Sequence, residues 1–183
     1  MSIASYRRNV GRRVTGQFFP TCFPSALEQI SPYGLNPDSY RDYRDFTDWF
    51  CSFPVDERDD LNPEVEEMLN CLFSDLGGLA VEDVAFKRAT TPIGLRRVLH
   101  SLFDEDYQVA VEIDWHKGWD VTHTLGLLPV DRDHVIAVSN YVPKSLSGIV
   151  HIDRIAERLA VTDDKYMPDF PFNNSNITAL PPD

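Results

Sequence analysis

The chain has 183 residues, of which 43% are hydrophobic and 11% are aromatic, and this composition suits one globular domain over residues 1–183. The net charge of −12 argues against nucleic-acid binding, because phosphate contacts need clustered Lys and Arg. No apolar run approaches the roughly 18 residues that span a membrane, and no apolar segment of a secretory signal follows the basic N-terminus. We therefore expect a cytoplasmic protein, although delivery by a specialised secretion system would leave no such signal.

The charge is unevenly distributed along the chain. Residues 1–16 contain four arginines and no acid, so the remaining residues carry a net charge of −16. We interpret residues 1–16 as a basic arm that is solvated or associated with a helix. The acidic remainder fits solubility or a basic partner equally well.

The first half of the sequence predicts helices. A helix is expected from Cys22 to Ser31, and aromatic residues at helical spacing predict another over residues 39–50. Asn62 and Pro63 open an amphipathic helix that Gly77 and Gly78 close, and Val81–Lys87 is expected to be a short strand. A further capped amphipathic helix is predicted from Thr91 to Phe103.

The second half predicts an antiparallel meander. Strands are expected over Tyr107–Asp114, Val121–Val130 and His134–Tyr141, with turns at 115–120 and 131–133. Residues 147–152 could add a strand and Asp153–Leu159 a closing helix, whereas residues 166–183 are expected to form an irregular tail. Helices followed by strands predict an α+β fold in which N-terminal helices pack on a C-terminal antiparallel sheet.

Cys22 lies at a predicted loop-to-helix junction, and its position favours reactivity. The unpaired N–H groups and the positive dipole end of a helix stabilise a thiolate. Gln17 could direct an amide N–H toward the same point and serve as an oxyanion donor. Cys51 and Cys71 are expected to be small buried hydrophobic residues, and the three cysteines show neither zinc-ligand spacing nor a C-x-x-C pair. We expect no metal and no cofactor.

A catalytic thiol needs a base and a group that orients the base. His123 begins a predicted strand, and the hairpin turn at 131–133 returns Asn140 to its level. The predicted strand pairing would therefore place an amide beside the imidazole, as in a Cys-His-Asn triad. His116 and His134 are alternative bases, and His100 is expected to be a surface or cap histidine.

These residues give the chain a resemblance to papain-like cysteine peptidases, most closely to the bacteriocin-processing (double-glycine leader) peptidase group. The shared positions are Gln17, Cys22, Pro24, Ala26, Leu27, His123 and Asn140. The resemblance implies a papain-like fold in which Cys22 is the nucleophile, His123 the base and Asn140 its orienting group. It also implies that Gln17 and the Cys22 N–H form the oxyanion hole. The chain departs from the group at Phe23, where glycine is usual, and at Asn140, where aspartate is usual.

The resulting expectation is a cysteine-dependent amide hydrolase that acts on a protein or peptide through an acyl-enzyme. Glutamine deamidation or transamidation by an effector or toxin would use the same residues. A non-catalytic papain-like module that binds a protein partner is the alternative from another functional class. The acidic segment between residues 36 and 75 predicts a substrate surface different from that of the peptidases.

Overall fold

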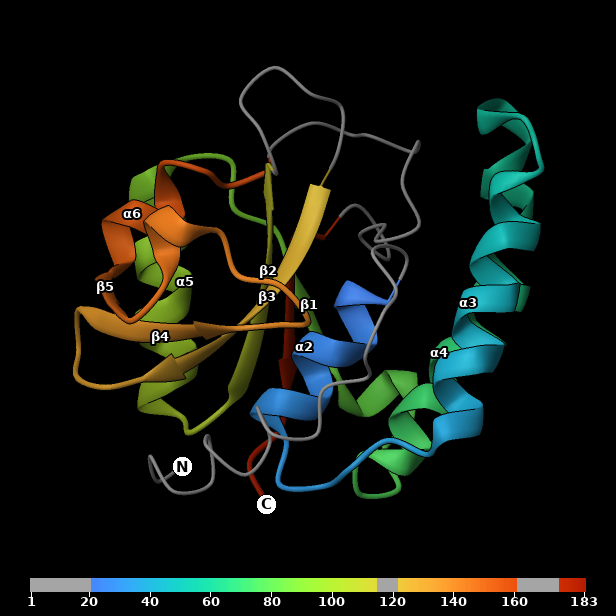
Figure 1. Cartoon of the computed structure of the whole chain (residues 1–183), viewed down its shortest axis with the longest axis horizontal. Helices are drawn as coiled ribbons and strands as arrows, with labels where there is room; N and C mark the ends of the chain where they lie inside the picture. The colour runs from blue at the N-terminus through green and yellow to red at the C-terminus, as the bar shows by residue number, and fades with distance from the viewer. Residues whose placement is uncertain (1–20, 115–121, 161–174) are drawn as a thin grey trace.

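The computed structural model describes residues 21–114, 122–160 and 175–183. Within these ranges, five α-helices pack on the two faces of a six-stranded antiparallel sheet (Figure 1). The helices come first and most of the strands follow, so the predicted α+β class is confirmed. Among the described helices, none has the length and apolarity that a membrane span needs.

The helices begin where the sequence provides suitable caps. The Asn36 side chain accepts a hydrogen bond from the Asp38 N–H, and the Thr91 hydroxyl accepts one from the Gly94 N–H. Thr21 occupies the N-cap position of the helix that begins at Cys22, but its side chain makes no capping hydrogen bond. The α-helices are α2 (Cys22–Ile30), α3 (Pro37–Cys51), α4 (Asn62–Asp75), α5 (Pro92–Asp104) and α6 (Ile152–Ala156), and the 3-10 helices are η1 (Val55–Leu61), η2 (Val81–Asp83) and η3 (Lys144–Leu146).

The strands form one sheet in the order β1-β6-β2-β3-β4-β5, and every neighbouring pair is antiparallel. The predicted meander is confirmed in its central three strands, although β4 ends three residues before Tyr141. Of the strand predicted at Val81–Lys87, only Ala85–Lys87 is a strand, and Val81–Asp83 forms a 3-10 helix. The turn predicted at 115–120 lies outside the described residues. The strands are β1 (Ala85–Lys87), β2 (Gln108–Asp114), β3 (Thr122–Pro129), β4 (His134–Val138), β5 (Ile149–His151) and β6 (Ile177–Leu180).

The expectation of an irregular tail over residues 166–183 is wrong in its described part. Strand β6 lies between β1 and β2, and all four of its residues are buried. The Asn176 side chain secures this position, because its Nδ2 donates to the Ala89 and Ala160 carbonyl oxygens and its Oδ1 accepts from the Ala89 N–H. The C-terminal residues are therefore part of the sheet that supports the rest of the fold.

The two faces of the sheet carry separate cores. Side chains alternate along a strand, so residues two apart share a face. Helix α2 covers one face, called here the α2 face, where Ala110, Leu128 and Val138 join the core of α2, α3 and α4. Leu125 and Leu127 point to the opposite face and pack with α5 and α6.

Gly126 lets α2 approach the sheet closely. A Cβ at this position would lie 2.4 Å from Ile30 Cγ2 and 2.9 Å from the Ala26 carbonyl oxygen. Both distances are too short for a real side chain, so the absence of a Cβ sets the spacing between α2 and β3. The same contact identifies which face of β3 is directed toward α2.

Candidate functional site

The structure places Cys22 at the first position of α2, as the sequence predicts. Its side chain is nevertheless almost fully buried, with 1% of its surface exposed. The Cys22 carbonyl oxygen lies 3.5 Å from the Ser139 hydroxyl, which joins the start of α2 to the segment after β4. The predicted oxyanion donor Gln17 lies outside the described residues.

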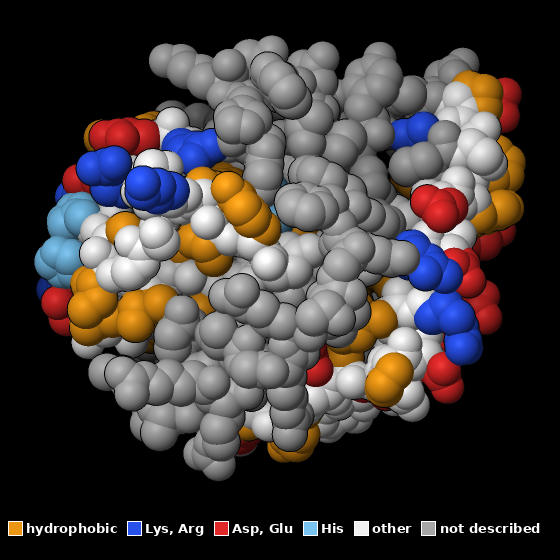
Figure 2. Space-filling model, in the orientation of Figure 1, with side chains coloured by type: hydrophobic (Ala, Val, Ile, Leu, Met, Phe, Trp, Pro, Cys, Tyr) orange, Lys and Arg blue, Asp and Glu red, His pale blue; other side chains and the backbone are white. Residues whose placement is uncertain are grey.

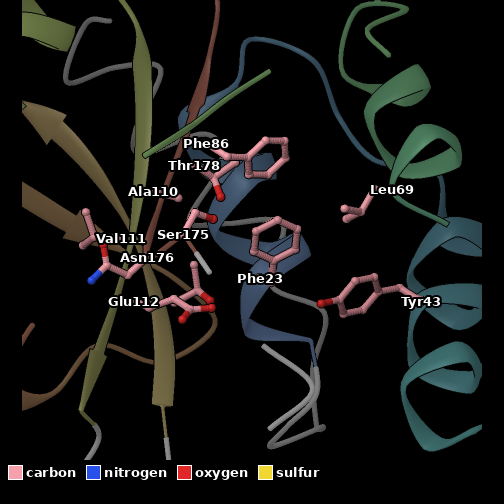
Figure 3. A pocket seen from close by; sticks show the side chains of 11 residues that line it. Phe23, Tyr43, Leu69, Phe86, Ala110, Val111, Glu112, Ser175, Asn176 and Thr178 are labelled. Carbon is pink, nitrogen blue, oxygen red and sulfur yellow. The ribbon is translucent and has the colours of Figure 1, made fainter. Parts of the chain in front are cut away.

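Phe23 fixes the helical layer through a contact with α3. Its ring is buried and stacks on Tyr43 of α3, with centroids 5.9 Å apart and planes 24° apart. Figure 3 shows Phe23 between the sheet and α3. The bulky residue that departs from the peptidase pattern thus has a structural use, which is to hold α2 against α3.

The imidazole of His123 points away from α2. His123 pairs with Ile113 in the β2–β3 register and shares the face of Leu125, which packs with α5 and α6. Its Nε2 lies 2.7 Å from the Tyr141 carbonyl oxygen, so the neutral ring donates this hydrogen bond. Burial lowers the pKa of His123 to about 4, the bond to Tyr141 opposes this shift, and the Arg158 charge adds to it.

Asn140 lies beside the start of α2. Its Nδ2 is 3.5 Å from the Thr21 hydroxyl, and its Oδ1 accepts a hydrogen bond of 3.2 Å from Ser139. The sequence predicted that the hairpin would bring the Asn140 side chain to His123. In the structure the next residue, Tyr141, contacts His123 through its backbone carbonyl, so the predicted pairing is off by one residue. The structure brings Cys22 and Asn140 together and places His123 on the other face of the sheet.

The remaining sequence candidates do not supply a base near Cys22. His134 lies at the opposite end of β4 from Asn140, and its Nδ1 is 2.9 Å from Asp131. His100 lies 3.3 Å from Asp133, and His116 falls outside the described residues. Cys71 is exposed on α4, which corrects the expectation that it is buried, and nothing is described of the Cys51 side chain.

A small pocket on the α2 face is lined by both apolar and polar side chains. Its lining includes Phe23, Tyr43, Glu112 and Thr124, from α2, α3, β2 and β3 (Figure 3). Thr124 is buried, and its hydroxyl has no hydrogen-bond partner among the described residues. A threonine hydroxyl cannot accept the thiol proton as an imidazole does, so the strand presents the wrong residue type to α2.

A second candidate surface lies on the helical arm, the name used here for α3, η1 and α4 (residues 37–75). These residues contain 12 Asp and Glu and 3 Arg, and so carry −9 of the chain's −12 charge. Several of the exposed carboxylates have no cation within ion-pair distance in the described chain. They are Asp48, Glu57, Asp60, Glu64, Glu66 and Glu67.

The helical arm also presents aromatic side chains next to these carboxylates. Phe46, Trp49, Phe50 and Phe53 form an aromatic cluster with centroid separations of 4.9–6.0 Å, and Trp49 is 41% exposed. The Arg58 guanidinium lies 5.3 Å from the Phe50 ring centroid. Figure 2 shows carboxylate, basic and apolar side chains intermixed along the α3 edge of the molecule.

The helical arm is firmly attached to the rest of the fold. Tyr40 of α3 donates a 2.6 Å hydrogen bond to the Glu28 carboxylate of α2, and Tyr43 stacks on Phe23. The buried sides of α3 and α4 belong to the same core as α2. The charged surface therefore stands on rigid elements, and the sequence signal for it is the density of acids between residues 36 and 75.

Comparisons with known proteins add no identification. No family model, curated protein or solved structure matches the chain. Among the described residues, no three His, Cys, Asp or Glu side chains gather as metal ligands would.

Proposed function

We propose that this chain is a non-catalytic module that binds a basic protein partner through the helical arm. The observation that carries the proposal is the charge of the arm, which holds −9 of the net −12 on two helices that pack rigidly against α2. Clustered like charge on a rigid surface attracts an oppositely charged partner and accelerates encounter.

The placement of His123 supports a non-catalytic role. A general base must lie within reach of the nucleophile and have a pKa near the working pH. The His123 ring points to the face opposite α2, and its pKa is lowered to about 4. The Cys22 thiol is also buried, so a substrate carbonyl could not reach it without a rearrangement of the surrounding chain.

Two charge-matched variants test the proposal. The arm variant Asp48→Asn, Glu66→Gln, Glu67→Gln and the control variant Asp104→Asn, Glu105→Gln, Glu157→Gln each remove three exposed carboxylates. The probe is a 12-residue peptide of alternating arginine and glycine, and calorimetric titration at low salt measures its Kd. We expect about tenfold weaker binding by the arm variant and a change below about twofold in the control.

The control variant distinguishes binding at the helical arm from non-specific electrostatic attraction to the acidic chain. If both variants bound the peptide equally weakly, only net charge would matter, and the proposal would be contradicted. Absence of binding to the unmodified chain would contradict it as well. Circular dichroism melting of both variants establishes that the affinities compare folded proteins.

A thiol-dependent amide hydrolase is the second candidate function, and the position of Cys22 at the start of α2 beside Asn140 favours it. On the α2 face its base would be Glu112, the carboxylate in the pocket that Phe23 lines. Iodoacetamide labelling at neutral pH, followed by peptide mapping, tests this candidate. The binding module predicts that exposed Cys71 reacts faster than buried Cys22, whereas a hydrolase requires the reverse order.

A further inference from the structure

The aromatic cluster of the helical arm lies among carboxylates. Asp42 and Asp45 precede Phe46 and Trp49 by one helical turn, so each acid shares a face of α3 with an aromatic ring. Asp48 adjoins Trp49 in the chain and has no cation partner among the described residues. An exposed π face next to negative charge suits a cationic side chain better than an apolar one.

The chain itself shows that the cluster accommodates a guanidinium. Arg58 lies over Phe50, and its Nε donates a 3.0 Å hydrogen bond to the Phe53 carbonyl oxygen. Arg58 is buried, so this internal contact occupies the inner part of the cluster. Trp49 remains 41% exposed, and its ring meets Phe53 edge to face at 4.9 Å.

We infer that Trp49 is the anchor for an arginine side chain of the basic partner, an inference that rests on the proposed function. The guanidinium stacks on the indole, and the Asp48 carboxylate, which has no cation partner among the described residues, balances its charge, whereas Asp45 already pairs with Arg44 at 2.7 Å. Arginine is favoured over lysine at this position because its planar, weakly hydrated group stacks on aromatic rings, whereas an ammonium remains strongly hydrated. The arm therefore distinguishes between two basic partners of equal charge.

Peptides of equal charge test the inference. The probes are the alternating arginine–glycine 12-mer and its lysine–glycine counterpart, titrated at low salt into the full chain and its variants. We expect the arginine peptide to bind the unmodified chain about three- to tenfold more tightly than the lysine peptide. Trp49→Leu should reduce this ratio to about one, whereas Trp49→Phe, which keeps a π face, should retain much of it.

The matched control is Tyr141→Leu, which removes an aromatic side chain that is 44% exposed outside the helical arm. It should leave the arginine preference unchanged. Equal binding of the two peptides to the unmodified chain, or a preference that survives Trp49→Leu, would overturn the arginine anchor and leave the proposed function intact. Failure of both peptides to bind would overturn both proposals.

Discussion

At the scale of residues, the surroundings of His123 bear on whether it could serve as the base for Cys22. A buried neutral imidazole that donates to the Tyr141 carbonyl oxygen is a structural group, since both its pKa and its direction are unsuited to activating Cys22. The strand that carries it presents Thr124 to α2 instead. Cys22 thus begins α2, whereas the His123 ring is directed to the face of the sheet that packs with α5 and α6.

The lowered pKa of His123 predicts acid sensitivity. The unfolded chain binds the proton near pH 6.5 and the folded chain only near pH 4, so stability is full above pH 6.5 and falls as the pH decreases toward 4. The loss from this group is about 3 kcal/mol. Urea unfolding measured at several pH values from 7 to 4 should show this loss of stability. The variant His123→Gln should have a smaller slope of the free energy of unfolding against pH. An unchanged slope in this variant would show that other groups cause the acid sensitivity.

At the scale of elements, the contact between α2 and β3 depends on Gly126. Gly126→Ala should lower the free energy of unfolding by about 1–3 kcal/mol, because the added methyl group meets Ile30 and the backbone of Ala26. Thr124→Val is the matched control on the same face, since it replaces a buried hydroxyl that has no partner among the described residues with a methyl group of similar size. The control should be neutral or slightly stabilising. If the Gly126→Ala variant were as stable as the control, Gly126 would not set the spacing between α2 and β3.

The elements also show what the sequence could predict. Periodicity and caps identify α2 to α5 and the central strands, because each has a local pattern. Strand β3 is buried on both faces, so its pattern does not reveal which side chains meet α2. Gly126 was the available signal, since a glycine within a strand marks a close backbone approach and places Thr124 on the same face.

Long-range pairing explains the C-terminal strand that sequence reasoning missed. β6 has only four residues and follows a polar, proline-rich segment, so nothing local distinguishes it from a tail. It becomes a strand because β1 and β2 offer free edges and the Asn176 amide bonds to Ala89 and Ala160. Contacts between residues 87 positions apart have no signature in a single sequence.

In the molecule as a whole, one region supplies most of the sheet packing and another carries most of the net charge. The sheet with α2, α5 and α6 provides the stable body, and the helical arm carries three quarters of the net charge on helices attached through Phe23 and Tyr40. This division is expected for a protein that presents a binding surface on a rigid support. A hydrolase would instead concentrate its titratable groups around the nucleophile.

The most direct test is to locate the bound peptide by amide chemical-shift mapping. The arginine–glycine 12-mer is titrated into the isotopically labelled full chain, and the perturbed amides are assigned along the sequence. The binding module predicts that the largest shifts cluster in α3, η1 and α4, with a maximum near Trp49. Shifts concentrated around Cys22 and Asn140, or spread evenly over all exposed carboxylates, would contradict the helical arm as the binding surface.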